Sequence, residues 1–220
     1  MATTGEHHPA FEEYCECIFE LREDQVDVIQ ARVADRLGVS RPSVSEMIKR
    51  MELEGLIVVR GAKISLTADG DVLAERVVRR HRIAERFLTD ILGLSWANAH
   101  HEAGKWEHIM NLDVETAMNR VLQNPTTCPH GNPIPGSSYQ QERITPLCEV
   151  AEGKLFTVNR IPEELEFASG VLELLEQANI KPGHSGTVIT SNKDGSRVVR
   201  VDSADVALDE FTSSRILVLA

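Results

Sequence analysis

The chain has 220 residues, of which 42% are hydrophobic, so it is long enough to build more than one compact domain. No apolar run approaches the roughly 20 residues of a membrane span, and the acidic stretch over 1–13 lacks the apolar core of a signal peptide, so we expect a cytoplasmic protein with no membrane partner. The formal net charge of −11 argues against general nucleic-acid affinity, and four irregularly spaced cysteines argue against a disulfide framework.

The first predicted helix combines an apolar stripe with a crowd of carboxylates. Its apolar residues follow helical spacing: Phe11, Tyr14, Cys15, Ile18 and Phe19. Its acidic residues are Glu12, Glu13, Glu16, Glu20, Glu23 and Asp24. Such a concentration of like charge repels itself unless water solvates it or a cation neutralises it. Both interpretations, a solvated acidic face and a cation-binding face, are open at this point.

A helix-turn-helix with a wing is predicted next. Its elements are a helix over 28–37, a helix over 40–53, and two short strands over 56–60 and 63–67. Gly38 suits the left-handed position that ends a helix, while Ser40 is a typical N-cap and Pro42 fits the first turn. The turn at Gly61 joins the two strands into a hairpin.

The same stretch is locally basic, and this favours contact with DNA. Residues 30–63 hold seven basic and four acidic side chains, a local balance of +3. We predict the following DNA-contacting residues: Ser40, Arg41, Pro42, Ser43 and Ser45 at the start of the recognition helix, and Lys49, Arg50 and Arg60 for phosphates. The alternative is a winged helix that binds another protein.

Three further helices are predicted over 68–92, 97–110 and 114–123. Their apolar positions exceed what the winged part can cover, so we expect a helical dimerisation unit. The potential metal donors lie on three helices: Glu13 and Glu16, then His81 and Glu85, then His100, Glu107 and His108. A single such residue is usually structural, but seven donors on helices that must pack together indicate a divalent-cation site. A zinc hydrolase is a weaker alternative, because a His-Glu-x-x-His motif is absent.

The last part of the chain reads as a small β module. The segment 128–136 is dense in Pro and Gly and indicates a rigid turn before a linker. Strands are predicted over 156–160, 186–190, 198–201 and 215–219, with a helix over 171–178, which suggests a small β-barrel.

The whole chain resembles the diphtheria-toxin-repressor family of metal-dependent transcriptional repressors, and within it the manganese-transport-regulator branch in its three-domain form. The stretches that carry the likeness are 33–37 with 40–46, 51–57, 81–86, 100–108 and 131–136. The resemblance implies a mainly α fold with a small β module. Its three domains would be a winged helix-turn-helix over 1–75, a helical dimerisation and metal-binding domain over 76–140, and an SH3-like β-barrel over 145–220.

The resemblance also implies a homodimer that binds a palindromic DNA operator when a divalent metal joins the first helix to the dimerisation helices, with no small organic ligand. The primary metal site falls on Glu13, Glu16, Gly104, Glu107 and His108. Glu13 and Gly104 stand where iron-type relatives carry methionine and cysteine, so the loss of sulfur favours Mn²⁺ and repression of manganese-uptake genes. At Gly104 only the backbone carbonyl is available, and the thiol of Cys17 could contribute. Fe²⁺-dependent repression of iron-uptake genes is the alternative, with Co²⁺ or Zn²⁺ as other candidate metals.

An ancillary metal site falls on His81, Glu85 and His100. In relatives, side chains of the SH3-like module complete it. The aligned positions here are Phe167 and Gly170, which have no side-chain donor, so Glu164 or Glu166 is expected to compensate.

Overall fold

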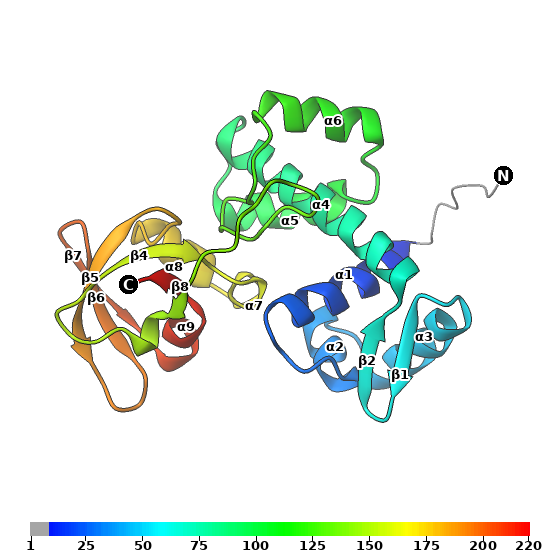
Figure 1. Cartoon of the computed structure of the whole chain (residues 1–220), viewed down its shortest axis with the longest axis horizontal. Helices are drawn as coiled ribbons and strands as arrows, with labels where there is room; N and C mark the ends of the chain where they lie inside the picture. Colours follow the sequence, from blue (N-terminus) through cyan, green and yellow to red (C-terminus); the bar gives the residue numbers. More distant parts are fainter. Residues whose placement is uncertain (1–8) are drawn as a thin grey trace.

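The computed structural model describes residues 9–220; residues 1–8, the start of the domain predicted over 1–75, lie outside the described residues. The chain forms a helical part with a hairpin, a second helical part and a C-terminal sheet module, shown from blue to red in Figure 1. None of the helices between residues 9 and 220 combines the length with the apolar character that a membrane span requires.

The N-terminal part is a winged helix-turn-helix. Its elements are α1 (Pro9–Glu23), α2 (Gln30–Leu37), α3 (Arg41–Leu53), β1 (Ile57–Arg60) and β2 (Lys63–Leu66). Gly38 ends α2 with φ of 64°, and its N–H donates to the carbonyl of Ala34. The hydroxyl of Ser40 accepts a hydrogen bond from the N–H of Ser43 and caps α3. β1 and β2 pair antiparallel, so the predicted helix-turn-helix and wing are confirmed.

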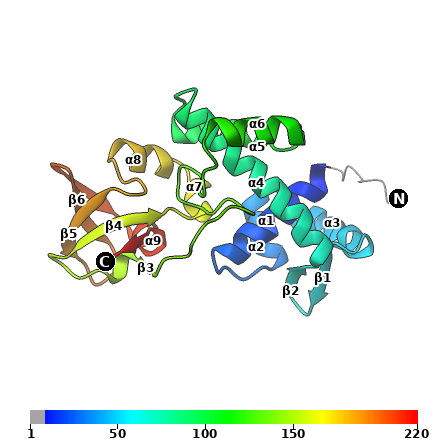
Figure 2. The ribbon, with the colours of Figure 1, turned by 45° about the horizontal axis from the view of Figure 1, so that its top comes forward.

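A single long helix connects the winged part to the rest of the helices. α4 (Ala68–Asp90) starts two residues after β2, capped by the hydroxyl of Thr67, and the ribbon in Figures 1 and 2 runs unbroken towards α5 (Trp96–Trp106) and α6 (Leu112–Val121). Its first half, with Leu73 and Val77, closes the core of the winged part, while Ile83 and Leu88 belong to the core of the second helical part. The predicted domain boundary after residue 75 therefore falls inside α4.

The C-terminal module is built on an antiparallel sheet. The strands are β3 (Thr145–Pro146), β4 (Leu155–Arg160), β5 (Ser185–Ser191), β6 (Arg197–Val201), β7 (Ala204–Leu208) and β8 (Leu217–Leu219), in the order β3-β8-β4-β5-β6-β7. The helices are α7 (Glu163–Glu166), α8 (Val171–Gln177) and α9 (Glu210–Arg215), with a 3-10 turn, η1 (Leu147–Glu149). The predicted sheet module is confirmed, and the closure of an SH3-like barrel stays a prediction. The expected strand over 215–219 is shorter, since α9 occupies residue 215.

The sheet module is fixed to both helical parts. Trp96, at the start of α5, is buried in the core of the module, and its backbone N–H donates to the carboxylate of Glu176 on α8. Arg82 of α4 is fully buried and lies 2.7 Å from Glu23 of α1 and 3.0 Å from Glu163 of α7. One guanidinium thus contacts all three parts of the chain.

Candidate metal centre

Polar side chains of α1, α4 and α5 converge on one cavity of about 530 Å³. Glu16 and Cys17 line it from α1, His81 from α4, Gly104 from α5, and Glu107 from the residue directly after α5. We call cluster 1 the group formed by Glu12, Glu16, His81, Glu107 and His108. We call cluster 2 the group formed by His81, Glu85, His100 and Glu166. His81 belongs to both, with one ring nitrogen turned to each.

In cluster 1, one buried carboxylate contacts two imidazoles, one on α4 and one in the turn that follows α5. Oε2 of Glu107 lies 2.5 Å from Nδ1 of His81, and its Oε1 lies 3.2 Å from Nε2 of His108. Oε1 of Glu16 lies 3.9 Å from Nδ1 of His81 and is buried without a hydrogen-bond partner. The ligand atoms of Glu16, His81 and Glu107 all lie within 4.8 Å of one another.

The acidic residues of α1 divide between buried and exposed positions. Glu12 is buried and accepts hydrogen bonds from Nδ1 of His108 at 2.8 Å and from Arg76 at 3.1 Å. The side chain of Glu13 is 55% exposed and reaches only within 4.0 Å of Nε2 of His108. Among the acids of α1, the buried one beside His108 is therefore Glu12, which the sequence analysis included in the acidic group but not among the ligands.

The position of Gly104 is open. A Cβ built on this residue meets no atom within 4 Å apart from its chain neighbours and the nearby backbone of its own helix, so α5 leaves space for a side chain where the cavity faces α1. The thiol of Cys17 lines the same cavity, and burial raises its pKa. Hard oxygen and imidazole donors consequently dominate cluster 1.

Buried negative charge makes cluster 1 suited to a cation. Burial, together with the carboxylates of Glu107 and Glu20, raises the pKa of Glu16 well above its usual range. Burial favours the neutral ring of His81, but the carboxylates of Glu85 and Glu107 outweigh it and raise its pKa. In the metal-free protein, bound protons therefore compensate the buried carboxylates. A divalent cation can take the place of these protons.

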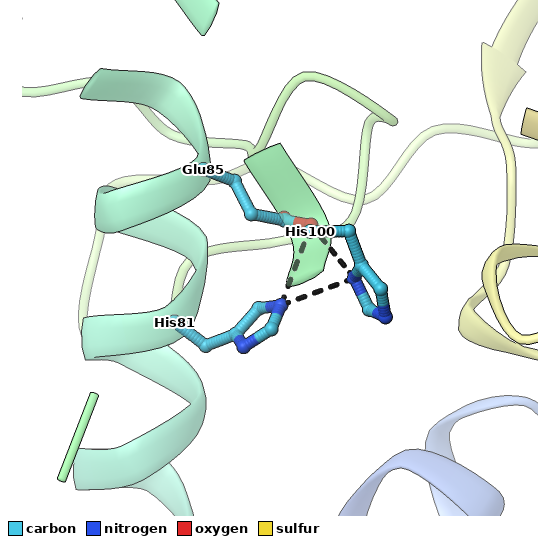
Figure 3. A group of neighbouring side chains, drawn as sticks. All are labelled: His81, Glu85 and His100. Atoms are coloured by element: carbon cyan, nitrogen blue, oxygen red, sulfur yellow. Dashed lines mark hydrogen bonds and ion pairs between the residues drawn. The ribbon is translucent and has the colours of Figure 1, made fainter. Parts of the chain in front are cut away.

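Cluster 2 lies on the other side of His81. Figure 3 shows Glu85 and His81 on α4 facing His100 of α5. Oε1 of Glu85 lies 3.3 Å from Nε2 of His81 and 3.0 Å from Nδ1 of His100, and the two ring nitrogens are 3.3 Å apart. Two atoms that bind the same cation with metal–ligand bonds of about 2.0–2.2 Å lie about 3 Å apart. The distances between these donor atoms therefore suit a shared cation.

The sheet module adds Glu166 to cluster 2. Its Oε2 lies 3.1 Å from Nδ1 of His100, while its Oε1 accepts a hydrogen bond from Asn132 at 2.7 Å. Glu164 turns away and pairs with Arg215 at 2.8 Å, so the structure brings only one of the two expected acids to this group.

Phe167 and Gly170, which stand where relatives carry metal ligands in the sheet module, have other functions in this structure. The ring of Phe167 packs edge-on against His100, with centroids 5.2 Å apart, and Gly170 precedes α8 in a left-handed conformation. Residues that the sequence analysis missed as metal donors include Glu12, His130 and Glu163, which all lie near the predicted ones. The spacing Cys128-x-His130 was the available signal for the second of these.

The predicted DNA-contacting residues lie together on α3 and the wing. Ser40, Arg41, Pro42 and Ser43 are exposed at the start of α3, as are Lys49, Arg50 and Arg60, whereas Ser45 is half-buried. The hydroxyls of Ser40 and Ser43 lie 2.8 Å apart. These two serines cap the start of α3, so they are held against its backbone. Arg41 is the long basic side chain in this first turn.

Large apolar side chains remain exposed around the end of α4 and along α6: Ile91, Leu92, Ile109, Leu112, Val114 and Val121. Exposed apolar patches of this kind mark protein–protein contacts.

A winged helix-turn-helix that is joined by α4 to buried metal donors defines a metal-responsive DNA-binding protein.

Comparisons with known proteins agree with this class. Residues 8–63 match the family model "Iron dependent repressor, N-terminal DNA binding domain", and residues 67–136 match "Iron dependent repressor, metal binding and dimerisation domain". The chain is 37% identical over 209 residues to "Iron-dependent repressor IdeR" of Mycobacterium tuberculosis (strain ATCC 25618 / H37Rv), covering 90% of this chain and 91% of the relative. It is 46% identical over 126 residues to "Diphtheria toxin repressor" of Corynebacterium diphtheriae, covering 57% and 56%.

Solved structures show the same architecture. "Manganese-dependent transcriptional repressor complex with manganese" superposes with a TM-score of 0.85 at 28% identity, covering 96% of this chain and 99% of that one. "Structure of the manganese regulator SloR" gives 0.77 at 28% identity, covering 97% and 99%. The chain belongs to the iron-dependent repressor family, which includes the diphtheria toxin repressors. It is a metal-dependent transcriptional repressor with a DNA-binding and a dimerisation domain, and the hydrolase alternative is wrong.

Proposed function

We propose that the protein is a Mn²⁺-activated, homodimeric repressor of manganese-uptake genes that binds a palindromic operator in the cytoplasm. The observation that carries this proposal is the donor chemistry of cluster 1. Its contacts are made by carboxylates and imidazoles, and the open position at Gly104 supplies no sulfur. Oxygen-rich donor sets of this kind suit Mn²⁺ better than thiolate-rich ones do.

The cation would act by joining helices that carry different parts of the molecule. Glu12 and Glu16 lie on α1, His81 lies on α4, and Glu107 and His108 directly follow α5. A divalent ion neutralises their buried carboxylates and favours the arrangement in which α1 is held against α4 and α5. Because α1 packs in the same core as α2 and α3, this arrangement also fixes the recognition helix relative to the dimer.

Cluster 2 would hold a second cation between α4, α5 and the sheet module. Oε2 of Glu85 is buried without a hydrogen-bond partner, and Oε2 of Glu166 meets the imidazoles of His100 and His130 at 3.1 Å and 2.8 Å. Buried carboxylate oxygens beside imidazoles are suitable ligands for a divalent cation. Since Glu166 belongs to α7, occupation of cluster 2 stabilises the docking of the sheet module. We assign cluster 1 to activation and cluster 2 to this docking.

An Fe²⁺-dependent repressor of iron-uptake genes is the second candidate. The mycobacterial relative at 37% identity is named an iron-dependent repressor, and the thiol of Cys17 faces the cavity of cluster 1. A thiolate ligand would favour Fe²⁺ or Co²⁺ over Mn²⁺.

A side-by-side titration tests the proposal. The metal-free protein and a fluorescent promoter fragment from a manganese-uptake gene are titrated anaerobically with Mn²⁺, Fe²⁺ and Zn²⁺, and binding is followed by anisotropy. We expect half-maximal binding at a lower free Mn²⁺ concentration than free Fe²⁺ concentration. A Cys17→Ser variant with unchanged Mn²⁺ response supports the oxygen-donor assignment. Activation by Fe²⁺ alone, lost in Cys17→Ser, supports the second candidate.

A further inference from the structure

Phe167 stands between two cavities at the junction of the winged part and the sheet module. It directly follows α7, which extends from the sheet module towards α1 and α2 (Figures 1 and 2). Phe167 lines the cavity of about 530 Å³ beside cluster 1 and a second cavity of about 280 Å³ beside α2. The residue is 50% exposed, so its contribution depends on the few groups that its ring does touch.

One of these groups is the guanidinium of Arg36, in the last turn of α2. Its carbon Cζ lies 4.5 Å from the centroid of the Phe167 ring, within the range of a cation–π contact. The side chain of Arg36 is only 5% exposed, so water screens this contact weakly. Among the hydrogen bonds, ion pairs and ring contacts of residues 9–220, this is the one that joins α2 to the sheet module.

Helix α1 fixes the same guanidinium. Nη1 of Arg36 donates a hydrogen bond to Oε2 of Glu20 at 3.2 Å. Nη2 is buried without a hydrogen-bond partner and lies 4.0 Å from Oδ2 of Asp24. A guanidinium with an unused donor keeps positive charge available to the negative face of an aromatic ring. Phe167 is therefore an electrostatic partner of Arg36 as well as an apolar neighbour.

The ring of Phe167 also contacts the second helical part. It stands perpendicular to the imidazole of His100 on α5, with ring centroids 5.2 Å apart, which is a favourable edge-to-face arrangement. Arg36 lies two residues before Gly38, the turn that leads from α2 into the recognition helix α3. One side chain of the sheet module consequently connects α5 to the helix that precedes α3.

We propose that Phe167 is a positioning residue for DNA binding. Packed against His100, its ring holds Arg36 and thereby fixes the end of α2 relative to the dimerisation helices. The recognition helices of a dimer must reach two half-sites at a fixed spacing, so a loosely held α2 and α3 weaken operator binding. The proposal goes beyond the proposed function, because it requires neither a particular metal nor the donors of cluster 1.

Two substitutions of Phe167 separate its aromatic face from its apolar bulk. Phe167→Leu keeps a large apolar side chain without a π face, whereas Phe167→Tyr keeps the ring and can direct its hydroxyl into free space. With the activating metal at saturation, Phe167→Leu should weaken binding to the promoter fragment by about three- to tenfold, the range of a partly exposed cation–π contact. Phe167→Tyr should bind within about twofold of the wild type, because the same contact persists.

Phe211→Leu is the matched control. The ring of Phe211 also stacks on an arginine, with Cζ of Arg215 at 3.9 Å from its centroid, but both residues belong to α9 inside the sheet module. This variant should bind DNA like the wild type. An equal loss in Phe211→Leu would overturn the proposal, as would wild-type binding by Phe167→Leu or a Phe167→Tyr protein no better than Phe167→Leu.

A double-mutant cycle distinguishes this contact from two independent losses of stability. Arg36→Met and Phe167→Leu each remove the same stack, so their effects on DNA affinity and on the Tm of the metal-free protein should not add. Additive effects in both measurements would contradict the proposal. If circular dichroism shows that Arg36→Met unfolds, the comparison of Phe167→Leu with Phe167→Tyr still decides. The preference for Mn²⁺ over Fe²⁺ is measured separately on the wild type, so this proposal and the proposed function can fail independently.

Discussion

Replacement of Glu107 by glutamine should separate metal binding from folding. The carboxylate places its two oxygens against His81 and His108, and the amide keeps this shape but offers one neutral oxygen and an NH₂ group that cannot coordinate a metal. Loss of a residue that merely orients a metal ligand costs about 10–100-fold in affinity. For a direct anionic ligand we expect a loss above about 100-fold, or about 2.7 kcal/mol at 1.36 kcal/mol per tenfold.

The assay is calorimetric titration with Mn²⁺, followed by anisotropy with operator DNA. The Mn²⁺ concentration needed for half-maximal DNA binding should rise by the same factor as the dissociation constant, because both report on cluster 1. Glu102→Gln is the matched control: this side chain lies on α5, which Glu107 caps, but it is partly exposed and pairs with Lys105 at 2.7 Å. A Glu107→Gln protein whose Mn²⁺ affinity stays within threefold of the Glu102→Gln protein would refute the assignment of Glu107 as a ligand.

Three further outcomes follow from the site and the recognition helix. Lys49→Ala should weaken binding to all DNA sequences and reduce the salt dependence by about one unit, whereas Lys193→Ala in the sheet module should leave both unchanged; binding isotherms at several salt concentrations measure this. Gly104→Glu should enlarge the rise in Tm on adding Mn²⁺, because its side chain has free space facing cluster 1, and an unchanged or smaller rise in differential scanning fluorimetry would contradict that geometry. Burial lowers the pKa of His100, but its contacts with Glu166 and Glu85 outweigh this and raise it to about 10. This ion pairing stabilises the metal-free protein fully below about pH 6.5 and is lost as pH rises towards 10, so a cation must displace the proton at neutral pH. Metal affinity should therefore fall by up to about tenfold per pH unit on acidification for each proton displaced, with proton release detected in buffers of different ionisation enthalpy.

Periodicity and end signals were sufficient to predict the longer elements. The apolar stripe of α1, Gly38 and the Ser40 cap each reflect interactions within one or two helical turns, and the structure retains them. Short elements such as β3, β7, α7 and α9 form because distant parts of the chain hold them, so their own few residues carry little signal. The helices of the dimerisation part were predicted, like α1, from the helical spacing of their apolar residues.

The metal donors were predictable only where helical spacing placed them on one face. His81 and Glu85 come together on α4 as expected from that spacing, and the packing of α5 against α4 adds His100; their binding of metal stays a prediction. The burial of Glu12 depends on His108 and Arg76, which are distant in sequence. His130 reaches cluster 2 only because a loop returns to α4, and no periodicity encodes that return.

Helix α4 converts a small tilt at the metal centre into a larger displacement of the wing. His81 lies thirteen residues after the first residue of α4, and the wing ends two residues before the helix begins. At 1.5 Å per residue this is a lever arm of about 20 Å, so a pivot of about 5° at the histidine sweeps the far end through about 1.7 Å. Hydrogen bonds to phosphate tolerate only a few tenths of an ångström. The length of α4 therefore lets a tilt too small to disturb the packing around the cation disengage the wing from a DNA backbone.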